Sequence, residues 1–429
     1  MMDFSEAQNL VLSALRDSRD SVLITGVAGC GKSTLLRHWI KDSGESVMVL
    51  APTGIAALNV GGSTIHRAFG FHPSMNTDDP RITLKTRSLL HAVTTIVIDE
   101  ISMVRADLFS AVDIVLRSVK RKPDLPFGGV RMVMVGDFYQ LPPVVQQDEE
   151  RWMERYHGSR AGWVFFAPCF VELKPKVFFL GQSFRQAGDG SYTDLLNGVR
   201  RRDSSVVDGI NTVAKQGSYA GDSVPRLCAR RADVANQNAK GLRKLAIPSV
   251  SIRPSITGDA SKVPKDACTN LVLAEGARVM VTRNGQGYVN GSLGTLRSFD
   301  ARAELWNGEV VPAIAIELDR GFTVNVPRED KEIIGYETDD DGKLCKNVLA
   351  TVSQFPLELG YAWTIHKSQG QTLERACIDL GRGAFAHGQT YVALSRLTSG
   401  EGLYLSAPLT KSDLLLDPDV VTYFEQFAV

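Results

Sequence analysis

The chain has 429 residues, of which 44% are hydrophobic, and its 48 basic residues are balanced by 48 acidic ones, which is typical of a globular protein with two or three domains. A net charge of zero argues against a protein that coats duplex DNA, although it allows a narrow basic channel for one strand. Because no apolar run is long enough to span a bilayer and the six cysteines include no CxxC pair, we expect a reduced, cytoplasmic protein without structural zinc or a membrane partner.

Short apolar runs rich in Val, Ile and Met alternate with helical stretches in the first part of the chain. The N-terminal segment, 1–15, is typical of an amphipathic helix. Each apolar run that follows is bounded by Gly, Pro or an acidic residue, which indicates strands of a parallel sheet that are buried on both faces. We predict these strands at 21–25, 47–51, 95–99 and 131–136. Ligands bind such sheets beyond the carboxyl ends of the strands.

The same pattern returns in the second part of the chain. It predicts a strand at 226–229, a helix at 231–245 and further strands at 358–362, 376–380 and 402–405. Between them, 271–326 is punctuated by glycines and made of short alternating runs, which favours a small inserted β-barrel. The polar stretch 71–87 contains two prolines and indicates a small excursion from the first unit.

A glycine-rich motif, Gly26 to Ser33, fits the pattern GxxxxGK[ST] between a predicted strand and a predicted helix, 33–41. Glycines leave room for backbone N–H groups to surround phosphates. Lys32 then reaches the β- and γ-phosphates, and the Ser33 hydroxyl binds Mg²⁺. The other nucleotide-binding residues that we predict here are Gly29, Gly31 and Thr34. The sequence therefore predicts an ATP site.

Two acidic residues, Asp99 and Glu100, end the predicted strand 95–99. Beside a phosphate loop, Asp99 can hold Mg²⁺ through water, and Glu100 can orient and deprotonate the attacking water. Taken without the glycine-rich motif, the pair would be read as solvated acids at a strand end. Together the two motifs predict a nucleoside triphosphatase (NTPase) and nothing more specific.

Further motifs at strand ends indicate which class of ATP-hydrolysing protein this is. Gln140, in Gly-Asp-Phe-Tyr-Gln-Leu after the strand 131–136, can sense the γ-phosphate. Hydroxyls and backbone N–H groups at other strand ends suit phosphodiester contacts. The phrases in chain order are GVAGCGKST, APTG, STIH, DEIS, GDFYQLPPV, SFRQ, IHKSQGQT and YVALSR.

This order closely resembles superfamily 1 helicases, and within them the petite-integration-frequency (Pif) helicases, which are relatives of RecD. The resemblance runs from about Gln8 to Leu405, and GDFYQLPPV, IHKSQGQT and YVALSR are its most specific phrases. It implies an α/β fold of two RecA-like parallel-sheet domains, with a small wedge inserted in the first and a Src-homology-3-like β-barrel in the second. The ranges that we expect are 1–180 for the first domain, with the wedge at 68–88, then 181–250 and 353–429 for the second domain, with the barrel at 251–352.

The resemblance also implies an activity. We expect a monomeric, ATP- and Mg²⁺-dependent DNA helicase that moves 5′-to-3′ on single-stranded DNA and unwinds duplex, forked or G-quadruplex DNA. Closure of the two domains would bring arginines of the second domain to the γ-phosphate, where an arginine can raise the rate by on the order of 10³ or more. The residues carried over are Gln8 for adenine, Arg185 and Arg396 for the γ-phosphate, and Pro52, Thr53, Gly54, His66, His366, Lys367 and Ser368 for DNA.

Three other functions stay open at this stage. A RecD-like nuclease subunit would need an acidic metal cluster outside the ATP site, and the sequence shows none. An RNA-preferring motor would share the same motifs. A single-strand-binding protein that uses ATP only as a switch would not require Glu100 and Arg396. Separately, Phe69, Phe71 and Trp363 are candidates either for stacking on bases or for the core.

Overall fold

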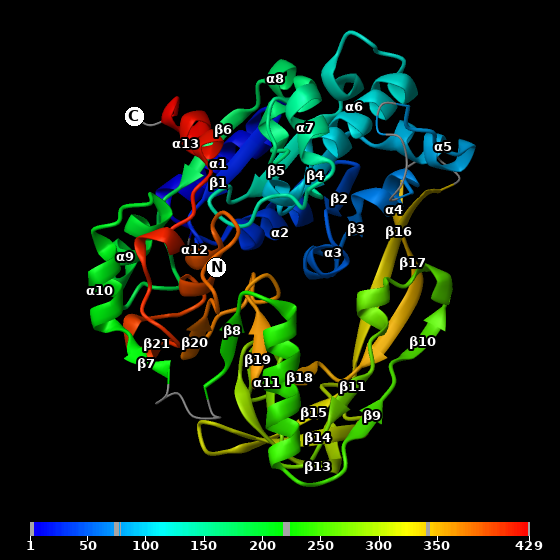
Figure 1. Ribbon diagram of the computed structural model, residues 1–429. Coiled ribbons are helices and arrows are strands. Elements are labelled where there is room, and N and C mark those ends of the chain that lie inside the picture. The colour runs from blue at the N-terminus through cyan, green and yellow to red at the C-terminus, as the bar shows by residue number, and fades with distance from the viewer. Residues whose placement is uncertain (1–3, 73–76, 78, 218–223, 340–343, 428–429) are drawn as a thin grey trace. The chain divides into compact units, whose positions relative to one another are not determined.

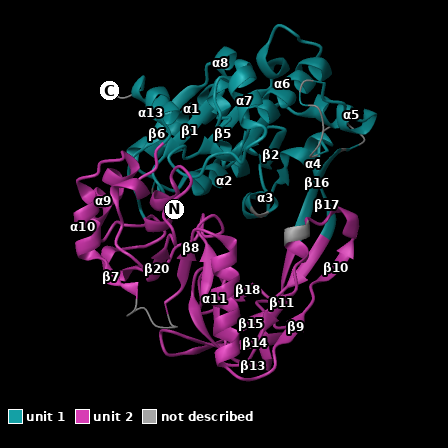
Figure 2. Cartoon of the chain, viewed as in Figure 1, with its two compact units in different colours: residues 1–184, 332–350, 417–429 teal, residues 185–331, 351–416 magenta. Residues whose placement is uncertain are grey.

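The structure is a computed structural model that describes residues 4–72, 77, 79–217, 224–339 and 344–427 (Figure 1). The chain forms two compact units (Figure 2). Unit 1 comprises Met1–Phe184, Glu332–Ala350 and Asp417–Val429, and unit 2 comprises Arg185–Lys331 and Thr351–Leu416. Among the described residues, no helix is long and apolar enough to cross a membrane.

Unit 1 is built on a parallel sheet with the strand order β3-β2-β4-β5-β1-β6. Its central strands are short and almost entirely buried, as the apolar runs predicted, because helices cover both faces, whereas the edge strand β6 exposes Lys176 and Phe179. Their bounds are β1 (Val22–Gly26), β2 (Val47–Ala51), β3 (Ser63–Thr64), β4 (Thr95–Ile98), β5 (Arg131–Gly136) and β6 (Lys176–Leu180).

The side chains of each strand alternate between two hydrophobic cores. On β5, Val133 and Val135 face the core that is shared with the helices α1 and α2, whereas Met132 and Met134 face the core on the opposite side. The helices of unit 1 are α1 (Glu6–Asp17), α2 (Lys32–Asp42), α3 (Gly54–Val60), α4 (Ile65–Phe69), α5 (Leu84–Ala92), α6 (Ala106–Lys120), α7 (Glu150–His157), α8 (Pro168–Leu173) and α13 (Pro418–Glu425), with short 3-10 turns at Ile101–Met103, Pro126–Gly129 and Val164–Phe166.

The C-terminal helix α13 packs on unit 1 (Figure 2), although we expected 353–429 to belong wholly to the second domain. The reason is an aromatic cluster. The ring of Tyr423 stacks on Phe165 with centroids 4.3 Å apart, and that of Phe424 lies 5.5 Å from Phe138. Val420 is fully buried in the same core. Only packing against distant residues reveals where this helix lies.

A β-hairpin also crosses the expected boundaries. Its strands are β16 (Glu329–Thr338) and β17 (Leu344–Gln354), and we expected both in the inserted barrel, 251–352. In the structure, 332–350 belongs to unit 1, because Tyr336 is buried in the unit 1 core and its hydroxyl bonds to the backbone of Val49 on β2.

Unit 2 contains a second parallel sheet, with the order β19-β8-β20-β21-β7. Its strands are β7 (Lys215–Gln216), β8 (Arg226–Cys228), β19 (Ala362–Thr364), β20 (Ala376–Asp379) and β21 (Leu403–Leu405), and its helices are α9 (Gly190–Arg200), α10 (Val206–Val213), α11 (Arg231–Lys244) and α12 (Gln389–Leu394). Short 3-10 turns lie at Ala260–Lys262, Lys265–Cys268, Gly400–Gly402 and Lys411–Asp413.

The segment 271–326 is rich in antiparallel strands, as the sequence predicts, and the barrel itself stays a prediction. Its main sheet has the order β15-β14-β13-β12-β18, and β9 pairs with β11 separately, while β10 joins the hairpin in the order β10-β17-β16. The bounds are β9 (Val250–Ile252), β10 (Ser255–Gly258), β11 (Leu271–Leu273), β12 (Arg278–Val281), β13 (Leu293–Glu304), β14 (Val310–Leu318), β15 (Thr323–Pro327) and β18 (Leu357–Leu359).

The prediction of a single strand at 358–362 is wrong, because the structure has two strands there, β18 and β19 (Ala362–Thr364). β18 pairs antiparallel with β12, and β19 pairs parallel with β8. The chain changes sheets at Gly360, whose N–H donates to the carbonyl of Arg278 and where a Cβ would lie 3.0 Å from the Val279 backbone. The glycine is visible in the sequence, but nothing local shows which sheet each side of it joins, so the break depends on tertiary pairing.

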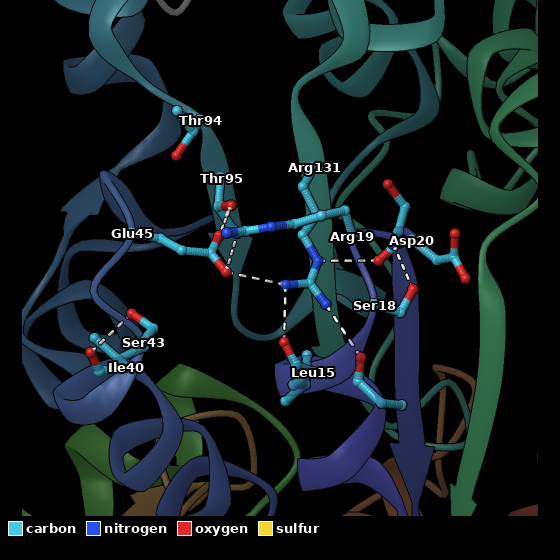
Figure 3. A network of polar contacts seen from close by, with 12 residues as sticks. Leu15, Ser18, Arg19, Asp20, Ile40, Ser43, Glu45, Thr94, Thr95 and Arg131 are labelled. Atoms are coloured by element: carbon cyan, nitrogen blue, oxygen red, sulfur yellow. Dashed lines mark hydrogen bonds and ion pairs between the residues drawn. The ribbon is translucent and has the colours of Figure 1, made fainter.

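A buried polar network fixes the amino end of the unit 1 sheet (Figure 3). The guanidinium of Arg131, at the start of β5, donates to the backbone carbonyls of Asp20, Leu15 and Ala14. It also pairs with the carboxylate of Glu45 at 3.2 Å. These bonds attach the last turn of α1 to the sheet. They thereby also help to position the first turn of this helix, which carries Gln8.

Candidate nucleotide and nucleic-acid sites

The nucleotide-site motifs of unit 1 lie at one edge of its sheet. The phosphate loop follows β1, Asp99 and Glu100 follow β4, and Gln140 lies just beyond β5. Since β5 lies between β4 and β1 in a parallel sheet, the carboxyl ends of these three strands are neighbours. The fold therefore brings together the loop, the acid pair and the predicted sensor.

The phosphate loop needs glycine at both of its ends. A Cβ at Gly26 would lie 2.3 Å from the carbonyl oxygen of Leu180, and Gly31, the N-cap of α2, has a left-handed φ of 81°. The loop is held from outside, because the N–H of Phe184 donates to the Gly29 carbonyl and the Ser183 hydroxyl donates to the Ala28 carbonyl. The amino end of α2 follows, where helical N–H groups favour an anion.

Lys32 is folded back across the loop. Its Nζ donates to the carbonyls of Gly26 and Val27, at 3.0 and 3.1 Å. Gln8 approaches the same loop from α1, and its Nε2 donates to the carbonyl of Cys30 at 3.1 Å. The Oε1 of Gln8 accepts from the N–H of Ser5 in a capping box. Gln8 therefore links the start of α1 to the loop, and its reading of adenine stays a prediction.

Ser33 and Asp99 form the predicted metal site. The Ser33 hydroxyl donates to Asp99 Oδ2 at 3.4 Å. Burial raises the pKa of Asp99, while the N–H of Glu100 and the charge of Lys32 oppose that rise. Glu100 has a left-handed backbone, with a φ of 53°, which is uncommon for a residue other than glycine and is found preferentially at functional sites.

The donor set at Ser33 and Asp99 fits Mg²⁺. Mg²⁺ binds hard oxygen atoms and keeps several waters, so one hydroxyl and one carboxylate beside substrate phosphates suffice. No cluster of three or more His, Cys, Asp or Glu side chains suited to a metal occurs among the described residues. The site thus has the ligands for an ion held mainly by phosphate and water.

Gln140 is buried and held by its own loop. Its Nε2 donates to Asp137 Oδ2 at 3.2 Å, and the other oxygen of Asp137 accepts the N–H of Tyr139. The rings of Phe138 and Tyr139 pack against Phe424 of α13. The C-terminal helix therefore supports the loop that carries the predicted sensor, a contact that no motif in the sequence indicates.

The predicted DNA-facing residues of unit 1 also follow strand ends. Pro52, Thr53 and Gly54 follow β2, and His66 lies in α4 after β3, the neighbouring strand. Thr53 is exposed and caps α3 by accepting the N–H of Ala56. Burial lowers the pKa of His66, and the charge of Arg105 adds to this, while Asp107 opposes it. His66 is therefore neutral at pH 7.

The two predicted γ-phosphate arginines lie together in unit 2. Arg185 donates to the Ser395 carbonyl at 2.7 Å and to the Thr372 hydroxyl at 3.0 Å. Arg396 is only 2% exposed and donates to the Ser395 hydroxyl and to the carbonyl of Ser368. One hydrogen-bond network thus joins both arginines to a predicted DNA-facing residue.

His366, Lys367 and Ser368 form a turn after β19. His366 and Lys367 are exposed, whereas Ser368 is buried and its hydroxyl donates to the Ile365 carbonyl. The Nζ of Lys367 pairs with the carboxylate of Glu358 at 2.9 Å. Sequence reasoning missed Glu358, because nothing in the motif indicates a partner from another strand.

Three aromatic residues that were open between stacking and core lie in the core. Phe69 and Phe71 are buried in unit 1, with ring centroids 5.2 Å apart. Trp363 is buried in unit 2, and its Nε1 donates to the carbonyl of Leu359. Part of the segment between 71 and 87, namely 73–76 and 78, lies outside the described residues.

The fold and these sites define a P-loop nucleoside triphosphatase (NTPase) with a second α/β unit that carries arginines. Residues 4–163 match the family model described as PIF1-like helicase. The chain is 31% identical to the ATP-dependent DNA helicase Pif1 of Bdellovibrio bacteriovorus, over 99% of this chain and 92% of that protein.

Solved structures agree. Pif1 from Bacteroides sp. in complex with ADP-AlF4 matches with a TM-score of 0.87 and 31% identity, over 100% of this chain and 97% of that one. Bacteroides Pif1 in complex with ADP-AlF3 and single-stranded DNA matches with a TM-score of 0.68, 31% identity, and 100% and 98% coverage. The chain therefore belongs to the Pif1-like helicase family, a family of ATP-dependent DNA helicases.

Proposed function

We propose that this chain is an ATP- and Mg²⁺-dependent motor that moves 5′-to-3′ along single-stranded DNA and unwinds duplex, forked or G-quadruplex DNA as a monomer. The observation that carries its ATP-hydrolysing part is the convergence of Lys32, Glu100 and Gln140 at neighbouring strand ends of one sheet. Family membership and the single-stranded DNA complex of the Bacteroides relative support the substrate class.

The residues of unit 1 suit phosphoryl transfer. Lys32 leaves the backbone carbonyls that it now contacts and binds the β- and γ-phosphates when ATP arrives. Mg²⁺ held by Ser33 and Asp99 would neutralise charge on those phosphates. Glu100 acts as general base toward the attacking water, and Gln140 exchanges its bond to Asp137 for one to the γ-phosphate or that water.

The network of unit 2 suits coupling of hydrolysis to DNA. We propose that two RecA-like domains close on ATP, with 68–88 serving as a wedge, and bring Arg185 and Arg396 to the γ-phosphate. Because Arg396 contacts the Ser368 carbonyl, a shift of its guanidinium toward a phosphate changes a turn proposed to face DNA. A ligand contact that differs between two states drives such a population shift.

Duplexes with one single-stranded tail test this function. Unwinding should require ATP, Mg²⁺ and a 5′ tail, and Lys32→Ala should abolish it because the loop then loses its phosphate cation. Unwinding from a 3′ tail would contradict the proposed direction of movement but not the proposed helicase activity. Equal activity on RNA tails would favour the RNA motor, shortened strands would favour the nuclease, and ATP-dependent binding without unwinding would favour the switch.

A further inference from the structure

Lys367, one of the proposed DNA-facing residues, already has an anionic partner in the protein. Its Nζ lies 2.9 Å from Glu358 Oε1, and the two side chains are 49% and 28% exposed. The backbone on both sides is fixed. Glu358 pairs with Met280 in the ladder of β18 and β12, and the N–H of Lys367 donates to the Thr364 hydroxyl. Both residues of the pair are therefore held by backbone hydrogen bonding within unit 2.

More charged groups surround this pair in unit 2. Lys331, on β16, is partly buried, and burial lowers its pKa. Glu329 and Glu358 oppose that shift, whereas Arg283 and Lys367 reinforce it. Glu329 itself pairs with Arg283 at 3.1 Å. Glu358 thus acts on both Lys331 and Lys367, while Glu329 has Asp330 as a neighbouring carboxylate.

A carboxylate and a DNA phosphate compete for the same ammonium group. Both are anionic oxygen acceptors, and two anions that share one partly exposed cation repel each other. A phosphate that approaches Lys367 must therefore displace Glu358 or bind beside its negative charge. Either way, the carboxylate weakens the contact relative to a neutral side chain of the same shape.

We propose that Glu358 is a positioning residue that takes the place of a DNA phosphate on Lys367 and thereby sets the affinity of the chain for single-stranded DNA. The inference rests on the proposed function, because it requires Lys367 to face the strand. Glu358 keeps Lys367 extended and engaged in the DNA-free protein, and it is released when a phosphate arrives. The strand thus binds more weakly than the cations alone would allow.

A double-mutant cycle on the full chain tests the proposal. Binding of a fluorescein-labelled oligothymidylate is measured by anisotropy, without nucleotide, for the unmodified chain, Glu358→Gln, Lys367→Ala and the double variant. Glu358→Gln should tighten binding about two- to five-fold, the range expected for an exposed ion pair. The gain should shrink as salt rises, because the pair is screened. In the Lys367→Ala background, less than half of the gain should remain.

Glu317→Gln is the matched control. Glu317 lies on β14 in the same unit and pairs with Arg297, so its replacement changes the net charge equally. It should leave DNA affinity unchanged, and thermal unfolding should show that each variant folds. Equal tightening by both glutamine variants, an equal gain with and without Lys367, or no gain from Glu358→Gln would each overturn the inference, provided that Lys367→Ala weakens binding. Unchanged binding by Lys367→Ala would instead remove Lys367 from the interface, and both claims about it would fail.

Discussion

The hydroxyl of Tyr336 completes the edge of the unit 1 sheet, and its removal has a calculable cost. This hydroxyl accepts the N–H of Val49 at 2.8 Å and donates to the carbonyl of the same residue at 3.2 Å. Strand β3 pairs only with Leu50 and Ala51, so it does not reach Val49. Tyr336→Phe keeps the ring in the core and removes both bonds.

The expected loss of stability follows from burial. Tyr336 is 8% exposed, so water does not readily replace the lost hydroxyl. A buried polar group without a partner costs about 1–3 kcal/mol, and Val49 has two groups at this site. We therefore expect the free energy of unfolding of unit 1 to fall by about 2 kcal/mol, which lowers the melting temperature by roughly 4–8 °C for a unit of this size.

Hydrogen exchange reports on this change directly. The Tyr336 hydroxyl protects the amide proton of Val49 from exchange with solvent. A peptide spanning β2 should therefore exchange its amide hydrogens faster in Tyr336→Phe than in the unmodified chain. Peptides of unit 2 should be unaffected. Unchanged exchange across β2, with unchanged melting, would refute the reasoning and would mean that Tyr336 does not pack on β2.

Three other perturbations have expected outcomes. Arg131→Met leaves Glu45 and three backbone carbonyls without this partner, so the free energy of unfolding measured in urea should fall by about 3 kcal/mol. Arg160→Met, at an exposed pair, should leave the urea midpoint unchanged. The pKa of His66 is lowered, so this side chain gains its proton only in acid. A contact with a DNA phosphate would raise that pKa, so the affinity for single-stranded DNA should rise as the pH falls from about 7 to 5. The rise should be smaller in His66→Gln. Phe424→Ala should destabilise unit 1 by about 2 kcal/mol and speed amide exchange after β5, and normal exchange there would contradict the contact.

Much of the parallel-sheet framework was predictable because strands buried on both faces leave a local signal. The predicted ranges 47–51 and 131–136 coincide with β2 and β5, and α11 begins at Arg231 as expected. The predicted strand 358–362 was wrong because a glycine inside a short strand pattern does not show by itself that the chain changes sheets there, as it does at Gly360.

The nucleotide site was predictable for a related reason. The chemistry of phosphate binding restricts residue types within a short segment, so Gly26 to Ser33 is recognisable without any tertiary contact. Parallel strands then place Asp99 and Gln140 at the same edge. The stacking candidates Phe69, Phe71 and Trp363 lacked such a restriction, because a large aromatic residue suits a core and a nucleic-acid surface equally well.

The sequence by itself determined the phosphate loop, the order of the motifs and the two-part α/β organisation, since each depends on local patterns or on residue chemistry. Only the tertiary structure decided that 332–350 and α13 pack on unit 1, that Arg185 and Arg396 share the contacts of Ser395, and that Glu358 holds Lys367. Those contacts join residues that are distant in the chain, and no periodicity or spacing encodes which partner a buried tyrosine or an exposed lysine will meet.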